Sequence, residues 1–291
     1  LDPQAKEKQK AEFELRKENK QRRYSWDFDE FYDLFEATPE GHILRNLTQT
    51  KGYDAEASWS PDGQWIAFAS NRQAYQEPLT EEKQKQLSQD PSYFMDIYLM
   101  NSEGQKVQQL TQEVGYDGGP FFSPDGQRIL WRHFSPDGRT SEIYTMKLDG
   151  SDKKQLTHLG VMSWAPFYHP SGDYLIFATN KHGFENFELY LVDAHGKSEP
   201  VRVTDNKSFD GLPVFTPDGN QLAWTSNQTS AKQSQLFMAN WNDTLARELL
   251  HLPSWQGIPC KGITCNASPS IPIQADALKT HIAYLASKEL K

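Results

Sequence analysis

One spacing, repeated four times, limits the folds open to this chain more than any other feature. A hydrophobic residue followed by threonine occurs at Thr48, Thr111, Thr157 and Thr204, and each threonine is followed 13 residues later by a proline. These prolines lie in Ser60-Pro61-Asp62-Gly63, Ser123-Pro124-Asp125-Gly126, His169-Pro170-Ser171-Gly172 and Thr216-Pro217-Asp218-Gly219. Recurrence at a period of tens of residues indicates a repeat architecture, in which similar units stack on one another.

Each repeat predicts four short strands. The segment before the proline is the first strand, and Pro-Asp-Gly is a tight turn, because proline presets φ, aspartate bonds its own backbone and glycine accepts a positive φ. A second strand follows at once, and a third lies at residues 96–100, 142–146, 188–192 and 235–239. A fourth strand ends at the next hydrophobic–threonine pair. Four strands in about 45 residues are one blade of a β-propeller, so the predicted fold class is all-β.

The pattern begins before the first complete repeat. Residues 32–37 and Leu44 reproduce the third and fourth strands of a blade, without the first two strands before them. We therefore expect four complete blades plus half a blade, with an insertion near residues 73–95. Since an open ring of blades would leave a bare sheet edge, we also expect the parent protein to carry more blades upstream.

Composition and charge exclude two classes of partner. The net charge is −9, so the chain lacks the basic face that nucleic-acid binding requires. No run approaches 18 consecutive apolar residues, which predicts no membrane-spanning helix. The opening is locally basic, with eight Lys or Arg against five Asp or Glu in residues 1–23, and we expect a solvated helix over residues 1–24.

The repeats resemble the Pro-Asp repeats of TolB-like propellers over residues 25–250. The resemblance rests on a series of Leu-Thr, Gly-Tyr-Asp, Ser-Pro-Asp-Gly and Ile-Tyr motifs, as at Gly115-Tyr116-Asp117. It implies a six-bladed parent whose channel face binds proteins or peptides, and a periplasmic or secreted location. The third complete repeat departs from the pattern at Ser163, which replaces the aspartate, and at His169, which opens its turn. These departures argue against a symmetrical ring of aspartates.

A second resemblance lies at the C-terminal end. Residues 276–291 are similar to the opening helix of zinc-dependent aminopeptidases of the two-zinc type, with Leu278, Ile282 and Leu285 at helical spacing. The resemblance implies that residues 251–275 are a linker and that a peptidase domain starts at residue 276. The zinc ligands would lie beyond this chain, in a propeller–aminopeptidase fusion.

Three aspartates are candidate binding residues. Asp54, Asp117 and Asp210 each follow the threonine of their repeat by six residues, near the entrance of the innermost strand. Carboxylates from several blades could converge there and bind Ca²⁺, which takes six to eight oxygen ligands. Alternatively, each aspartate caps its own turn by accepting hydrogen bonds from local backbone N–H groups.

A second set of candidates closes the second strand of three blades. Asn71, Arg72, Asn180 and Asn227 could line a rim that grips a peptide, or they could form hydrogen bonds between blades. The acidic, aromatic residues 26–33 lack the glycine and glutamate spacing of an EF-hand and are expected to form an edge strand.

Cys260 and Cys265 lie in a Gly/Pro-rich stretch and are either a local disulfide or two free thiols. No His-Glu-x-x-His, Gly-x-Ser-x-Gly or phosphate-loop motif is present, so the sequence shows neither a complete catalytic site nor a metal-ligand set.

Three functions follow as hypotheses. The first is a non-catalytic propeller that binds protein or peptide as the accessory or gating domain of a zinc-dependent peptidase. The second is a free-standing TolB-like interaction module of the cell envelope. The third is a propeller lyase, which requires clustered histidines facing the axis, and the repeats place none at equivalent positions.

Overall fold

The computed structural model describes residues 28–183, 186–229 and 233–255. The chain divides after Trp255 into two compact units, and all described residues belong to the first unit. The predicted helix over residues 1–24, the cysteines Cys260 and Cys265, and the predicted helix over residues 276–291 lie outside the described residues. The domain bounds drawn from the sequence therefore stay predictions.

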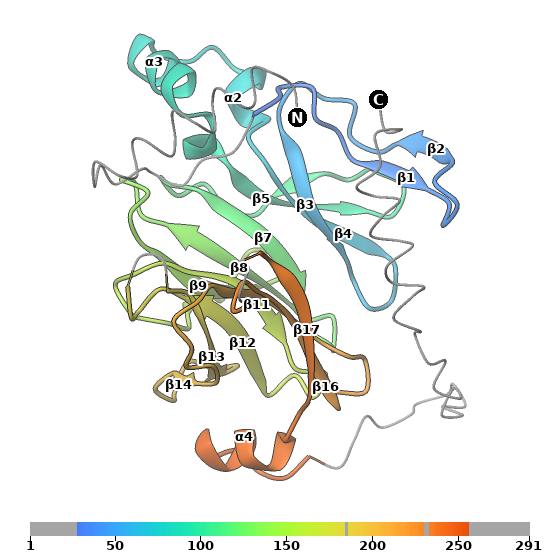
Figure 1. Ribbon diagram of the computed structural model, residues 1–291. Coiled ribbons are helices and arrows are strands. Elements are labelled where there is room, and N and C mark those ends of the chain that lie inside the picture. The colour runs from blue at the N-terminus through green and yellow to red at the C-terminus, as the bar shows by residue number, and fades with distance from the viewer. Residues whose placement is uncertain (1–27, 184–185, 230–232, 256–291) are drawn as a thin grey trace. The chain divides into compact units, whose positions relative to one another are not determined.

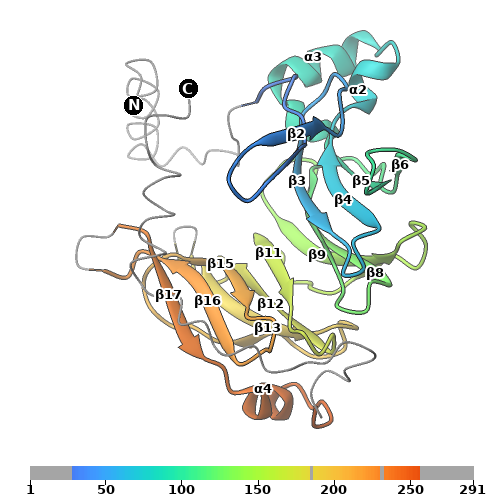
Figure 2. The same ribbon diagram turned by 90° about the vertical axis from the view of Figure 1, so that its right-hand side faces the viewer.

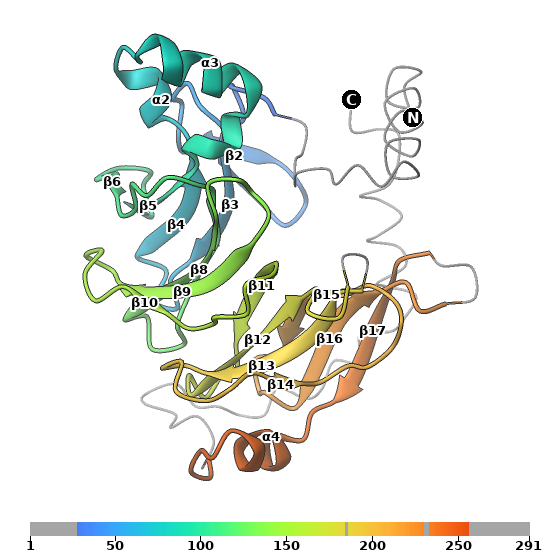
Figure 3. The same ribbon diagram turned by 90° about the vertical axis from the view of Figure 1, so that its left-hand side faces the viewer.

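Antiparallel sheets of short strands form the described unit (Figure 1), which confirms the all-β prediction. A two-stranded sheet, β1 (Phe35–Ala37) and β2 (Ile43–Asn46), is the expected half blade. Three four-stranded blades follow: β3 (Asp54–Trp59), β4 (Trp65–Ser70), β5 (Asp96–Asn101) and β6 (Gln108–Gln109); β7 (Asp117–Phe122), β8 (Arg128–Phe134), β9 (Ser141–Lys147) and β10 (Lys154–Gln155); and β11 (Ser163–Tyr168), β12 (Tyr174–Thr179), β13 (Glu188–Asp193) and β14 (Val201–Arg202). Figure 3 shows the last of these with its strands side by side in sequence order.

The fourth repeat forms three strands rather than the expected four within the described residues. These are β15 (Asp210–Phe215), β16 (Gln221–Ser226) and β17 (Gln235–Asn240), and the helix α4 (Asp243–Leu249) follows β17 (Figure 2). The side chain of Asn242 caps α4 by accepting a hydrogen bond from the amide of Leu245. The local sequence thus provides a helix start where the other repeats continue into a fourth strand.

Short helices fill the predicted insertion in the first complete blade. They are α2 (Gln73–Gln76), α3 (Glu81–Gln89) and the 3-10 helix η1 (Pro91–Phe94). Thr80 begins α3, because its side chain accepts a hydrogen bond from the amide of Lys83. In the ranges that the structure describes, no helix has the length and apolar composition needed to cross a membrane.

The threonine of each repeat ties the fourth strand to the third. The hydroxyl of Thr111 accepts a hydrogen bond from the amide of Ile97 at 2.9 Å and donates one to the carboxylate of Asp96 at 3.2 Å. Equivalent bonds join Thr48 to Leu34 and Asp33, Thr157 to Ile143 and Glu142, and Thr204 to Leu189. This bond gives a structural reason for the hydrophobic–threonine signature.

Backbone hydrogen bonds join each blade to the one before it. The amide of Asp117, which opens β7, donates to the carbonyl of Met95, the residue before β5, at 2.9 Å. The same bond joins Asp54 to Tyr32 and Asp210 to Phe187, both at 2.8 Å. In the third complete blade the amide of Ser163 donates instead to the hydroxyl of Ser141 at 3.0 Å.

Apolar side chains of successive blades form cores between the sheets. Ile97 and Leu99, on one face of β5, belong to the same buried cluster as Ile129 and Trp131 of β8. The next junctions repeat this arrangement, with Ile143 beside Tyr168 and Leu175, and with Leu189 and Leu191 beside Phe215 and Leu222. A blade therefore buries its two faces against two different neighbours.

The outermost described sheets expose residues at positions that the inner blades bury. Leu236 and Met238 of β17 are 58% and 57% exposed, whereas their counterparts Ile97 and Leu99 of β5 are 0% and 4% exposed. Phe35 of β1 is 53% exposed on the other outermost sheet. Within the described residues, β17 pairs on one side only, with β16.

Candidate functional site

Asp54, the first of the predicted site residues, lies in the interior at the start of β3. Its carboxylate accepts hydrogen bonds from the hydroxyl of Ser70 and, at 2.7 Å, from the guanidinium of Arg72. Arg72 is only 4% exposed, and its guanidinium lies over the rings of Phe68 and Tyr98. Both residues are therefore parts of a buried ion pair that joins the ends of two strands.

Asp117 and Asp210 hold the same position in β7 and β15 and are also buried. Asp117 accepts a hydrogen bond from the indole of Trp131 at 3.0 Å and lies 2.7 Å from Nδ1 of His133. Asp210 accepts one from the amide group of Asn206 at 2.5 Å. The partners that the described residues give these three carboxylates are all side chains, rather than the local backbone N–H groups of a turn cap. The binding role of the aspartates stays a prediction.

The predicted calcium ion stays a prediction. Among the residues that the structure describes, no three His, Cys, Asp or Glu side chains are grouped in a way that could hold a metal ion.

The three predicted rim asparagines make one repeated hydrogen bond. In each case the side-chain oxygen accepts from a backbone amide 18 residues earlier in the same blade, at 2.8–2.9 Å. The pairs are Asn71 with Tyr53, Asn180 with Met162, and Asn227 with Phe209. The bond joins the ends of the first two strands of one blade. It therefore differs from the hydrogen bonds between blades that were the alternative to a peptide-binding rim. Their role in binding stays a prediction.

The first strands form the inner layer of the blades and carry a bulge at their third residue. Contacts join β3 to β7, β7 to β11 and β11 to β15, so these strands line the propeller axis. The pairing with the second strand shifts register after the second residue in all four. The third residues have positive φ: Glu56 (55°), Gly119 (59°), Ala165 (48°) and Leu212 (54°). Bulges of this kind redirect side chains and recur next to binding sites.

Glu56 uses its bulge to reach the next blade. Its carboxylate accepts hydrogen bonds from the hydroxyl of Tyr116 at 2.6 Å and from the amide of Gly119 at 2.9 Å, and it pairs with Arg132 at 2.6 Å. Burial alone would raise the pKa of Glu56, but the charge of Arg132 and these hydrogen bonds hold the pKa below its ordinary value. Sequence reasoning missed this residue, although a charge within a repeated strand was a usable signal.

Two buried acids, Asp96 and Asp117, lie at the junction between β5 and β7. Asp96 accepts hydrogen bonds from Thr111 at 3.2 Å and from Gln109 at 2.9 Å, and it is 8% exposed. Burial and the nearby charge of Asp117 raise the pKa of Asp96 to about 8. The pKa of His133 is raised as well, because its hydrogen bond to Asp117 and the charge of that residue outweigh the lowering effect of burial.

The departure at His169 creates a contact between two turns. In the other repeats a hydroxyl at this position bonds the aspartate of the turn, as Ser60 does with Asp62 at 2.6 Å. Here Nδ1 of His169 accepts a hydrogen bond from the backbone amide of Ser171 at 3.2 Å. The proton of the neutral ring is then on Nε2, which donates a hydrogen bond to the carbonyl of Gly219 at 3.4 Å. The imidazole is fully buried, and burial lowers its pKa.

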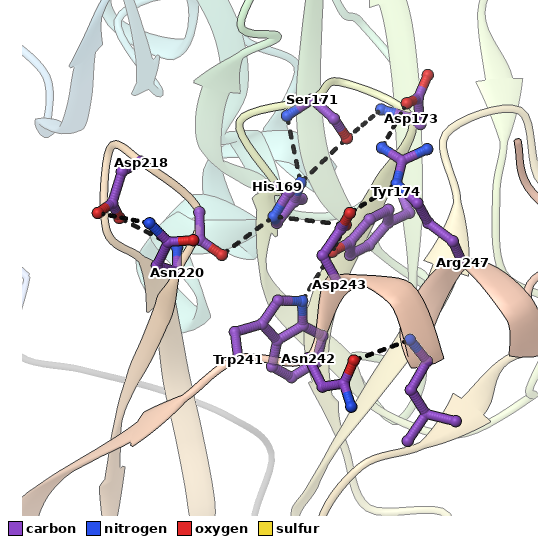
Figure 4. Close-up of polar contacts among 12 residues, drawn as sticks. His169, Ser171, Asp173, Tyr174, Asp218, Asn220, Trp241, Asn242, Asp243 and Arg247 are labelled. Carbon is purple, nitrogen blue, oxygen red and sulfur yellow. Dashed lines mark hydrogen bonds and ion pairs between the residues drawn. The ribbon is translucent and has the colours of Figure 1, made fainter. Parts of the chain in front are cut away.

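The imidazole belongs to a network that attaches α4 to the third and fourth blades (Figure 4). Tyr174 stacks on His169 with ring centroids 4.5 Å apart, and its hydroxyl donates to Asp243 at 2.8 Å. Arg247 donates to Asp243 at 2.9 Å and to Asp173 at 2.7 Å. Although histidine, tyrosine and aspartate are residue types of acid–base catalysis, the burial of His169 makes this network structural.

Replacing Arg72 by alanine should lower the free energy of unfolding by about 3–5 kcal/mol, because Asp54 would be left as a buried charge without its partner. Denaturant titration measures this loss. Arg139→Ala is the control, since Arg139 is 75% exposed and lies 3.9 Å from Asp137, and it should cost no more than about 1 kcal/mol. Equal losses in the two variants would contradict a buried ion pair at Arg72.

Replacing Asp96 by asparagine should stabilise the protein most at alkaline pH. Folding raises the pKa of Asp96 from its ordinary 3.8 to about 8, so the folded state binds an extra proton between these values and loses stability as pH rises through them. In urea titrations, the free energy of unfolding of Asp96→Asn should exceed that of the parent chain by on the order of 1–3 kcal/mol at pH 8.5. The difference should be far smaller at pH 4. A gain that does not change with pH would refute the assignment.

Replacing Gly219 by alanine should destabilise the protein more than the same change at Gly63. Both glycines have a positive φ in equivalent turns, but an added Cβ at Gly219 would lie 2.6 Å from Nε2 of His169, whereas Gly63 faces open space. We expect backbone strain to lower the free energy of unfolding by about 1 kcal/mol in both variants. The clash with His169 should lower it by about 1–3 kcal/mol more in Gly219→Ala. Denaturation midpoints that fall equally would argue against close packing of the two turns.

Two family models match the chain, each over less than half of it. The model described as "TolB beta propeller domain" matches residues 137–257, and that of the "Dipeptidyl peptidase IV (DPP IV) N-terminal region" matches residues 8–129. Among curated proteins, Dipeptidyl-peptidase 5 of Porphyromonas gingivalis is 36% identical over 86 residues, which are 29% of this chain and 11% of that protein. An uncharacterized protein of Agrobacterium fabrum is 28% identical over 109 residues, which are 38% of this chain and 31% of that protein. The chain thus spans less than a third of the length of either relative.

Solved structures give the same fold. A putative TolB from Agrobacterium tumefaciens has a TM-score of 0.52 at 20% identity, with 70% of this chain and 67% of that one covered. TolB from Acinetobacter baumannii has a TM-score of 0.53 at 24% identity, with 69% and 44% covered. Together with the blades and their threonine bonds, these matches show that the chain has a β-propeller fold similar to that of TolB.

Proposed function

We propose that the chain is a non-catalytic propeller that binds protein or peptide as the accessory or gating domain of a peptidase. The match of residues 8–129 to the N-terminal region of dipeptidyl peptidase IV, and the identity to a dipeptidyl-peptidase of Porphyromonas gingivalis, support the link to a peptidase. The zinc-dependent type is a finer proposal, which rests on the resemblance of residues 276–291. A periplasmic or secreted location belongs to the same proposal.

The observation that carries a binding role is the bulged inner face of the first strands. Leu212 is held at a positive φ and is 62% exposed, so its side chain gains little from burial in this structure. Left-handed backbone at a non-glycine residue costs of order 1–3 kcal/mol, and such strain collects at functional sites. The equivalent bulge positions of the other blades hold Glu56, Gly119 and Ala165. The fold therefore tolerates acidic, small and aliphatic residues at this position.

The inner face therefore offers a partner an exposed aliphatic side chain on one blade and a half-buried carboxylate on another. The side chain of Glu56 is 33% exposed and already paired with Arg132. A rigid sheet that presents such groups binds an extended chain with little loss of its own conformational freedom. An entering peptide would meet Leu212 as its apolar contact.

A free-standing interaction module of the cell envelope is the second candidate. The similarity in fold to TolB of Agrobacterium tumefaciens and of Acinetobacter baumannii favours it. The sequence of the gene beyond Lys291 separates the two candidates. A peptidase domain with His, Asp and Glu ligands would support the accessory role with zinc, and a stop codon would support the free-standing module.

Replacing Leu212 by aspartate should weaken peptide binding at least tenfold, which corresponds to about 1.4 kcal/mol. Fluorescence anisotropy with a fluorescein-labelled tryptic digest of casein measures this on the 291-residue chain. Val107→Asp is the control, because Val107 is 42% exposed in the connection between β5 and β6, away from the inner strands. The proposal fails if the parent chain does not bind the digest, or if both variants weaken binding equally.

A further inference from the structure

Two junctions between blades bring a pair of buried acids together in the same way. At the first, the amide of Asp117 is bonded to the residue before Asp96, and the charge of Asp117 raises the pKa of Asp96. At the second, the amide of Asp210 is bonded to Phe187, the residue before Glu188, at 2.8 Å. The repeat therefore places Glu188 and Asp210 as neighbours across the junction of β13 and β15.

The two junctions differ in how their acids are satisfied. At the first, Oδ1 of Asp117 accepts a hydrogen bond from the indole of Trp131 and contacts His133, and Asp96 accepts hydrogen bonds from two side chains. One oxygen of this pair, Oδ2 of Asp117, has no hydrogen-bond partner among the described residues. At the second, Trp224 occupies the position of Trp131, but its indole N–H has no hydrogen-bond partner in the described part of the chain.

Three buried oxygens at the junction of β13 and β15 lack a hydrogen-bond donor among the described residues. Oε1 of Glu188 pairs with Arg202, and Oδ2 of Asp210 accepts the amide of Asn206 at 2.5 Å. Among the described residues, no hydrogen bond reaches Oε2 of Glu188, Oδ1 of Asp210 or Oδ1 of Asn206. Glu188 and Asp210 are both 0% exposed.

Such a set of oxygens is costly unless a ligand satisfies it. A buried polar atom without a hydrogen bond costs about 1–3 kcal/mol, and an unpaired charge costs more. Arg202 balances one of the two carboxylates, which leaves one negative charge at the junction. The imidazole of His182 also lies near, with Nε2 3.9 Å from Oε2 of Glu188 and hydrogen-bonded to the hydroxyl of Tyr190.

We propose that the junction of β13 and β15 binds one Ca²⁺ ion through Oε2 of Glu188, Oδ1 of Asp210 and Oδ1 of Asn206. Carboxylate and amide oxygens are the ligands that this ion prefers, and its flexible coordination allows water to complete the shell. Because the third protein ligand is an amide, the site needs only two acidic side chains. It differs from a shared site of aspartates on the propeller axis, since its ligands come from two adjacent blades.

Calcium titration of the purified 291-residue chain tests the proposal. After treatment with a chelator, addition of millimolar CaCl₂ should raise the Tm of the parent chain by at least about 3 °C. Isothermal titration calorimetry should give about one site per chain. Asp210→Asn should abolish the increase in Tm, and Asn206→Ala should weaken the calcium affinity about tenfold.

Asp117→Asn is the matched control, because it removes the equivalent carboxylate from the other junction, where Trp131 and His133 already contact Oδ1 and Oδ2 is the one carboxylate oxygen of Asp117 without a donor among the described residues. This variant should keep the full calcium response. An unchanged Tm and no binding heat in the parent chain would overturn the proposal and assign the three oxygens to buried water. A full response in Asp210→Asn would overturn it as well, because the ion would then bind elsewhere.

Discussion

The hydrogen bond from the first residue of each blade to the blade before it is the interaction on which the remaining structure depends. It places Asp54, Asp117 and Asp210 next to the third strand of the preceding sheet. The threonine bond fixes that third strand to its own fourth strand. With these two bonds in place, the apolar faces of adjacent sheets meet in register. Stability in such an array is close to a sum of the blades and the contacts between nearest neighbours.

The same backbone geometry holds different electrostatics at each junction. A buried arginine pairs with Asp54, and an indole and an imidazole meet Asp117. At the third complete blade the hydroxyl of Ser141 bonds the backbone amide and carbonyl of Ser163, which replaces the aspartate. Only the positions of the backbone groups are repeated, so each junction can take a different set of side chains. A propeller can thereby acquire a local ion pair, a proton-binding pair or a ligand site without a change of fold.

The sequence predicted the strands well because turn chemistry and strand alternation act over a few residues. Each Pro-Asp-Gly turn and each threonine bond joins residues close enough in the chain to leave a repeated spacing. Local spacing could not predict the burial of Arg72, because an arginine just after a strand is usually exposed to solvent. The role of His169 depends on Tyr174, Gly219 and Asp243, and the last two come from a different repeat. Spacing within one repeat carries no information about such contacts.

Among the described residues, the exposed apolar face of β17 and its pairing on one side only have a consequence for association of the protein. An apolar strand with an unpaired edge lets any other unpaired strand add to its sheet through backbone hydrogen bonds alone. Leu236 and Met238 lie on a face of this sheet, so a second sheet packed against that face would cover them. Against this attraction stands the net charge of −9, which makes copies of the chain repel one another. Salt screens that repulsion over about 10 Å at 0.1 M but leaves the apolar contact intact, so ionic strength sets the balance between dispersed and associated protein.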